Sequence, residues 1–407
     1  MTKARAIPVS LHEPGEPASR GPQLKAFLEL GFRPLYMAGC AWALLSVALW
    51  IYAPQWLSSP LGGVAWHAHE MLWGFVATIA TGFLLTASAT WTGINPLKGL
   101  PLAAACALWL VARVGYLAGG HPAFYVAAAA ETAFYLLSAI VLLRVMVKGK
   151  SRRNYGIPFL VLGLGVANCL YLRASLSGNY AALMQHFELG LICMAVIALL
   201  VARRVIPFFA MRAIPGLAIP MLTRSGQAQM VLGIAAIVLG LAGQKHPMAL
   251  ALAATGLVSL YQIASWKPGA VLRKPILWIL YLGYAAMGVG LLLAAAHLAG
   301  LGTASPGTAV LARAAVHVHV IGMAGFSVLI IGMVTRTALG HLGRPLQLDK
   351  SMVASYWLVI LAVALRLAAL APSGAMQALL HASAAAWVAA FALYLWRFVP
   401  LLIRPRP

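Results

Sequence analysis

The chain has 407 residues, of which 62% are hydrophobic and only 9% are charged. This composition excludes an ordinary soluble fold, because too few polar side chains remain to cover a surface in water. The formal net charge of +22 could suggest a nucleic-acid-binding protein, but the Lys and Arg residues lie between hydrophobic runs and not along one face. We therefore predict a protein embedded in a lipid bilayer, with no nucleic-acid partner.

The chain divides into a polar tail and a single membrane domain. Residues 1–33 are rich in Pro and Gly and have no apolar core of the kind found in a cleaved leader, so we predict a mobile cytoplasmic tail. A transmembrane helix needs about 20 apolar residues, and Pro, Gly and basic residues divide 34–407 into twelve such segments, which predicts an all-α polytopic domain. The predicted spans are 34–53, 66–91, 97–118, 122–147, 156–175, 179–206, 225–243, 247–266, 275–299, 308–336, 352–371 and 375–402.

The basic residues indicate how these spans are oriented. Cytoplasmic loops collect Lys and Arg. With the N-terminus inside, every basic residue falls nearer the cytoplasmic side except Arg113, Arg173, Lys245, Arg313 and Arg366. An even number of spans with both termini in the cytoplasm is the orientation that this pattern predicts.

A weak internal repeat relates the second, sixth and tenth spans. Each carries histidine near its start, as His67-Ala-His69, His186-Phe-Glu188 and His317-Val-His319. The intervals between them are long enough for four spans each, which suggests three units of four helices. The three spans run in the same direction, so we expect their histidines at similar depth near the outer face.

The two His-x-His pairs are the strongest candidates for chemistry. Ionisable groups inside a membrane are costly and point to function. Residues i and i+2 of a helix point about 200° apart, so one such pair can offer imidazoles to cofactors on opposite sides, whereas one ion held by both would favour i, i+4 spacing. Haem iron accepts His, and no CxxCH motif is present, so any haem would be non-covalent. The alternative is interior histidines bonded to the backbone or to Ser and Thr.

Other ionisable residues in the spans have less specific roles. We predict His186 and His381 as metal ligands, the latter because it lies near the outer end of the last span. Glu70 could orient the imidazole beside it through a hydrogen bond. Glu131 is expected either to be protonated or to pair with Arg113.

Three segments resemble the signatures of a known family, the NnrS proteins. They are WHAHEMLWGF (66–75), RRVIPFF (203–209) and HVHVIGM…TRTALGHLGRP (317–345), and the resemblance extends over almost the whole chain after residue 30. NnrS proteins are described as twelve-span bacterial inner-membrane proteins that contain haem and copper. The resemblance implies a role in nitric oxide metabolism or in tolerance of nitrosative stress.

A more distant resemblance is to the large subunits of haem–copper oxidases and nitric oxide reductases, which also have twelve spans in three units. It implies that His69 and His319 bind a low-spin haem b, that His317 holds a second haem and that His186 is a copper ligand.

The chain departs from this second pattern in two places. The segment 225–243 has no pair of adjacent histidines, so His67 or His381 would have to complete a copper site. Position 190 is Gly where the oxidases carry Tyr, which argues against oxidase-type reduction of oxygen.

These observations predict a haem-binding inner-membrane protein that binds or converts nitric oxide or iron–nitrosyl species near the outer face. It would contain one or two b-type haems and copper, with quinol or a cytochrome as electron donor. The enzymatic form would be a haem-dependent oxidoreductase acting on nitric oxide. The alternatives are a transporter or a metal- or haem-handling protein without redox turnover, and a protective or sensing protein that binds nitric oxide without converting it.

Overall fold

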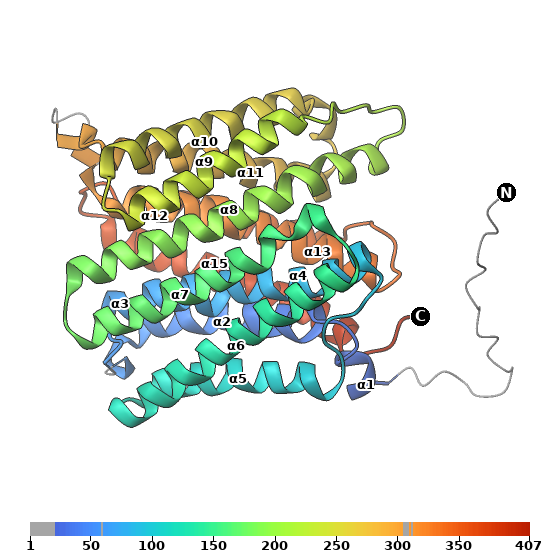
Figure 1. Cartoon of the computed structure of the whole chain (residues 1–407), viewed down its shortest axis with the longest axis horizontal. Helices are drawn as coiled ribbons and strands as arrows, with labels where there is room; N and C mark the ends of the chain where they lie inside the picture. The colour runs from blue at the N-terminus through green and yellow to red at the C-terminus, as the bar shows by residue number, and fades with distance from the viewer. Residues whose placement is uncertain (1–20, 58–59, 304–308, 311) are drawn as a thin grey trace, which may run out of the picture.

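The computed structural model describes residues 21–57, 60–303, 309–310 and 312–407 (Figure 1). The described residues are helical, with no strand, and twelve helices are long and apolar enough to cross a membrane. The prediction of an all-α polytopic membrane protein is confirmed. Most of the predicted tail lies outside the described residues, and its last part forms the short helix α1 (Leu24–Phe27) and the first turn of α2.

The observed spans follow the predicted ones closely. The largest differences are in the sixth span, which continues through Pro207, and in the tenth, which begins after Arg313 and ends at His341. In chain order the spans are α2 (Phe32–Tyr52); α3, η2 and α4 (Gly63–His69, Glu70–Val76, Ala77–Thr92); α5 (Leu100–Ala118); α6 (His121–Lys148); α7 (Gly156–Leu176) with the preceding η3 (Arg152–Asn154); α8 (Tyr180–Ala213); α9 (Thr223–Leu241); α10 (Lys245–Ser265); α11 (Pro275–Leu298); α12, η7 and α13 (Ala314–His319, Val320–Ser327, Val328–His341); α14 (Lys350–Ala368); and α15 (Met376–Leu402). Short connecting turns are η1 (Pro54–Trp56), η4 (Pro268–Val271) and η5 (Leu301–Thr303).

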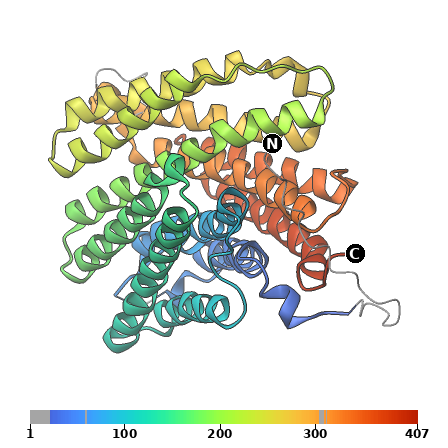
Figure 2. The same ribbon diagram turned by 45° about the vertical axis from the view of Figure 1, so that its right-hand side comes forward.

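Neighbouring helices in the chain pack side by side from α5 to α11, and the last span, α15, packs against the first, α2 (Figures 1 and 2). Arg33 joins the two ends of the chain: its guanidinium donates to the carbonyl oxygens of Leu402 at 2.9 Å and Arg404 at 2.6 Å. The helix α1 and the C-terminus therefore lie at the same end of the bundle, as an even number of spans requires.

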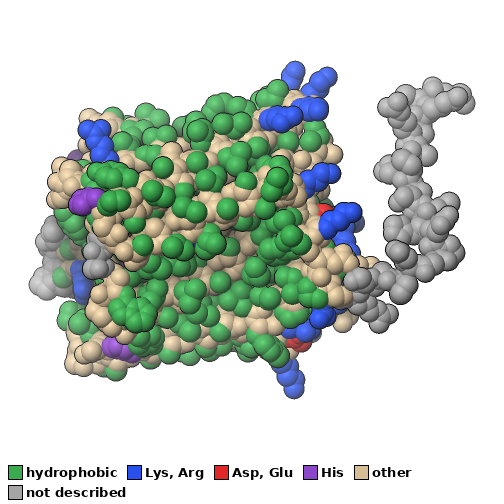
Figure 3. Space-filling view, turned by 90° about the horizontal axis from the view of Figure 1, so that it is seen from below, with side chains coloured by type: hydrophobic (Ala, Val, Ile, Leu, Met, Phe, Trp, Pro, Cys, Tyr) green, Lys and Arg blue, Asp and Glu red, His purple; other side chains and the backbone are tan. Residues whose placement is uncertain are grey.

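On the face seen in Figure 3, hydrophobic side chains cover the flank of the bundle, and Lys and Arg gather at its two ends, more of them at the end that carries the C-terminus. Lipid tails can solvate such a flank, whereas charged groups need water or headgroups. This distribution is that of a multi-pass membrane protein.

The second, sixth and tenth spans form the centre of the bundle. Of their most apolar windows, 83%, 72% and 67% are buried inside the protein, more than in any other described span. Within this group η2 packs against η7, and α8 contacts both α3 and η7. The three helices related by the histidine repeat therefore meet, whereas the grouping into three units of four spans stays a prediction.

Both His-x-His pairs are followed directly by a π-helical segment. The segment η2 begins at Glu70, after His69, and η7 begins at Val320, after His319. π-Helical turns hold one more residue than α-helical turns and are frequent at functional sites, because they change the direction of the side chains beyond them. Hydropathy patterns carry no signal for this change of pitch, and the sequence did not predict it.

Candidate cofactor site

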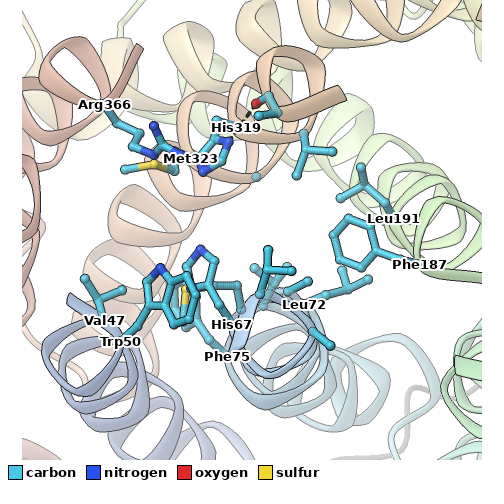
Figure 4. A pocket seen from close by; sticks show the side chains of 18 of the residues that line it. Val47, Trp50, His67, Leu72, Phe75, Phe187, Leu191, His319, Met323 and Arg366 are labelled. Carbon is cyan, nitrogen blue, oxygen red and sulfur yellow. Dashed lines mark hydrogen bonds between the residues drawn. The ribbon is translucent and has the colours of Figure 1, made fainter. Parts of the chain in front are cut away.

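A cavity of about 390 Å³ lies between the central helices, and α2, α14 and α15 close its remaining sides (Figure 4). Its walls are mostly aliphatic and aromatic, and the few polar groups include His67, His319 and Arg366. Cofactor pockets typically measure roughly 300–1,000 Å³ and combine apolar walls with a few polar groups. This cavity has both properties.

His67 enters the cavity from α3. Its ring stacks on the indole of Trp50, with centroids 5.2 Å apart and the planes 8° from parallel. Its Nδ1 atom is buried and has no hydrogen-bond partner among the described residues. A buried polar atom without a partner is costly, so a ligand at this nitrogen would remove that cost.

His319 enters from α12 on the opposite side. Its Nδ1 lies 2.6 Å from the carbonyl oxygen of Ala315, one turn earlier. A carbonyl can only accept a hydrogen bond, so Nδ1 carries the proton and Nε2 of the neutral ring keeps its lone pair. Metal-ligating histidines commonly have their tautomer set in this way. Figure 4 shows the two imidazoles extending into the cavity from opposite walls, with Arg366 beside His319.

His69 points away from this cavity into a buried polar cluster. Its Nδ1 is 2.8 Å from a Glu70 oxygen, and its Nε2 is 2.9 Å from Oδ1 of Asn168 and 3.0 Å from Oε2 of Glu131. Because Asn168 donates through Nδ2 to Glu131, its oxygen faces the imidazole. Both ring nitrogens therefore face acceptors, which favours a doubly protonated, positively charged ring with no lone pair for a metal.

Arg113 completes this group, which we call the buried charge cluster: His69, Glu70, Arg113, Glu131 and Asn168. The guanidinium bonds to both carboxylates, while Trp42 donates to Glu70 at 2.5 Å and Tyr116 to Glu131 at 3.0 Å. Two carboxylates balanced by two cations make the cluster neutral, the condition under which charges persist in a membrane interior. The predicted pairing of Glu131 with Arg113 and the predicted hydrogen bond of Glu70 to its neighbour are confirmed.

His317 points away from the cavity on the other side of α12. The residue is 3% exposed, its Nε2 lies 3.6 Å from Oε1 of Glu188, and its ring centroid is 4.9 Å from that of His297. Each His-x-His pair thus sends one ring into the cavity and the other elsewhere, as the i, i+2 geometry predicts. The structure places His67, and not His69, opposite His319.

The two predicted metal ligands are not brought together. His186 of α8 is half-buried, and His381 of α15 hydrogen-bonds through Nδ1 to the Gln377 carbonyl at 2.8 Å. Neither lines the cavity. The part of the chain that the structure describes contains no group of three or more His, Cys, Asp or Glu side chains placed to hold a metal ion.

Sequence reasoning missed three residues that shape the site: Trp50, Asn168 and Arg366. Asn168 had a detectable signal, since it is an amide in the middle of an apolar span. Arg366 was counted only as one of the few basic residues on the outer side. Trp50 carried no signal in the sequence, because aromatic residues are common in membrane spans.

Comparison with known families agrees with the resemblance that the sequence motifs carry. The family model described as "NnrS protein" matches residues 26–406. This chain belongs to the NnrS family. The match includes all twelve spans of this NnrS protein, among them the central three that carry the histidines. No curated protein matches the chain.

Proposed function

We propose that this NnrS-family protein binds a b-type haem between His67 and His319 and uses it to bind or convert nitric oxide or iron–nitrosyl species. The observation that supports the proposal most is the pair of imidazoles facing one another across an apolar cavity of cofactor size. The site would lie toward the outer face of a bacterial inner membrane, with both termini in the cytoplasm.

The cavity residues fit a haem in three respects. Nε2 of His319 has a lone pair, and His67 has a buried nitrogen without a hydrogen-bond partner. Facing helices of a bundle commonly supply the histidines that would hold a haem. The aliphatic and aromatic walls suit a flat macrocycle. Arg366 is the cation of the cavity wall and is suited to neutralise a propionate.

When bound, haem would supply an iron that exchanges single electrons and that ligates nitric oxide when the gas takes the place of one of the two imidazoles. The chain would orient both imidazoles, through Trp50 for His67 and through the Ala315 carbonyl for His319. Its apolar walls would exclude water from the metal. Quinol or a cytochrome would donate electrons. The proposal also includes copper, because the family that the chain resembles is described as containing copper as well as haem.

The test is a reduced-minus-oxidised optical spectrum of the protein purified in mild detergent, repeated with nitric oxide and paired with metal analysis. We expect the optical spectrum to show b-type bands that shift when nitric oxide is added. Metal analysis should give one or two haem irons per chain. Protein that neither retains haem nor takes it up on reconstitution would contradict the proposal and favour a transporter or metal-handling role. Steady-state consumption of nitric oxide under a reductant would distinguish an enzyme from a protein that only binds the gas.

A further inference from the structure

A second, smaller cavity of about 80 Å³ adjoins the first on the same three central helices. All its lining side chains are apolar except Tyr36, whose hydroxyl hydrogen-bonds to Thr337 at 3.0 Å. Water in such a hollow would find almost no partner, and apolar cavities of this kind stay dry and take up small apolar atoms such as xenon. The cavity is therefore suited to a small uncharged molecule.

The two cavities share part of a wall. Val76, the last residue of η2, and Phe326, near the end of η7, line both of them and are 4% and 2% exposed. These two side chains therefore lie between the hollows, and both residues belong to π-helical segments that follow the His-x-His pairs. They are the side chains whose movement a molecule passing between the cavities would require.

We infer that the small cavity is a binding site for an apolar diatomic gas, which exchanges with the cofactor cavity past Val76 and Phe326. A diatomic molecule without charge loses no hydrogen bond when it leaves water for aliphatic walls. The volume holds such a molecule but not a cofactor, since a water molecule alone takes up about 30 Å³ in the liquid. Identifying the gas as nitric oxide rests on the proposed function, whereas the binding site itself does not.

Xenon tests the site without any cofactor. Crystals of the full chain pressurised with xenon should show an anomalous peak between Phe83, Ala198 and Met333, which line the cavity. Ala198→Leu should remove the peak by filling the space. Ala107→Leu, the same change at an exposed position of α5, should leave it. Absence of the peak in the unaltered protein, or ordered water or an acyl chain in its place, would overturn the inference.

Gas kinetics test the exchange. In haem-loaded protein, Ala198→Leu and the milder Ala80→Val should slow rebinding of carbon monoxide after flash photolysis several-fold while leaving the absorption spectrum unchanged. Unaltered rebinding in both filled variants would refute the exchange and leave the haem proposal standing. Conversely, a xenon peak in protein that binds no haem would support the gas site and contradict the proposed function.

Discussion

His67 of α3 and His319 of α12 face one another across a single cavity, although they belong to different spans and different His-x-His pairs. The other member of each pair lies outside the cavity: His69 belongs to the buried charge cluster, and His317 lies 3.6 Å from Glu188. Substitutions of His67 and His69, the two members of one pair, should therefore have different effects.

If the proposed function holds, His67→Ala and His319→Ala should each abolish the spectroscopic signature of haem held by two histidines, because each would remove one of the two imidazoles proposed to bind the iron. His69→Ala should lower the yield of folded protein but leave that signature intact in the folded fraction, since His69 does not line the cavity. Low-temperature electron paramagnetic resonance would report the ligation, with the exposed His121→Ala as the control. The reverse result, with His69 essential and His67 dispensable, would restore the pairing expected from the oxidase resemblance.

Glu131→Gln should destabilise the protein by about 3–5 kcal/mol, because it leaves two buried cations facing a single carboxylate. Adding Arg113→Met to that variant should recover part of the loss, since one carboxylate and one cation then remain. Unfolding in detergent would measure both effects. Glu29→Gln is the matched control: its carboxylate is 54% exposed and 4.0 Å from Arg33, so a loss of at most about 1 kcal/mol is expected. Equal losses at the two positions would refute a charge-balanced cluster.

Gly190→Ala should cost about 1–3 kcal/mol through overpacking. A Cβ atom there would lie 2.6 Å from Cζ2 of Trp73, and that indole is held by its hydrogen bond to the Leu164 carbonyl at 3.0 Å. Gly163→Ala is the matched control in α7, because its Cβ would meet only Cys193 Sγ at 3.7 Å. We expect it to stabilise the chain by about 0.4–1 kcal/mol. Thermal unfolding of both variants would decide whether close packing explains the glycine.

Asp349→Ala should destabilise the junction of α14 and α15 by about 1 kcal/mol. The carboxylate caps α14 through Met352 N at 3.0 Å and meets Arg397 Nε at 2.7 Å. Partial burial alone would raise the pKa of Asp349. Hydrogen bonds from Ser351 and Met352 and the positive charge of Arg397 outweigh this effect and hold the pKa below its ordinary value.

Because the pKa of Asp349 is lower in the folded than in the unfolded chain, its charge stabilises the fold at neutral pH. That contribution disappears as the pH falls through the lowered value. Asp349→Asn keeps the cap but has no charge, so its stability difference from the unaltered protein should stay constant above about pH 5 and shrink as the pH falls through the lowered pKa of Asp349. A difference that does not change with pH would show that Arg397 and the charge contribute nothing.

Hydropathy and charge alone predicted the twelve spans, because a bilayer requires each crossing segment to be long, apolar and helical. The histidine repeat likewise identified the second, sixth and tenth spans as related and predicted that their histidines lie at similar depth. The opposite directions of His67 and His69 followed from helix geometry, which depends only on local spacing.

Only the tertiary structure decided which histidine of each His-x-His pair lines the cavity. The partners that fix His69 come from α6 and α7, and no local pattern states that Glu131 and Asn168 converge on it. The π-helical turns, the stacking of Trp50 on His67 and the small gas-sized cavity likewise depend on contacts between segments far apart in the chain. Hydrophobicity and helix period are properties of neighbouring residues, whereas the free or occupied state of an imidazole depends on which distant side chains packing brings within hydrogen-bond distance.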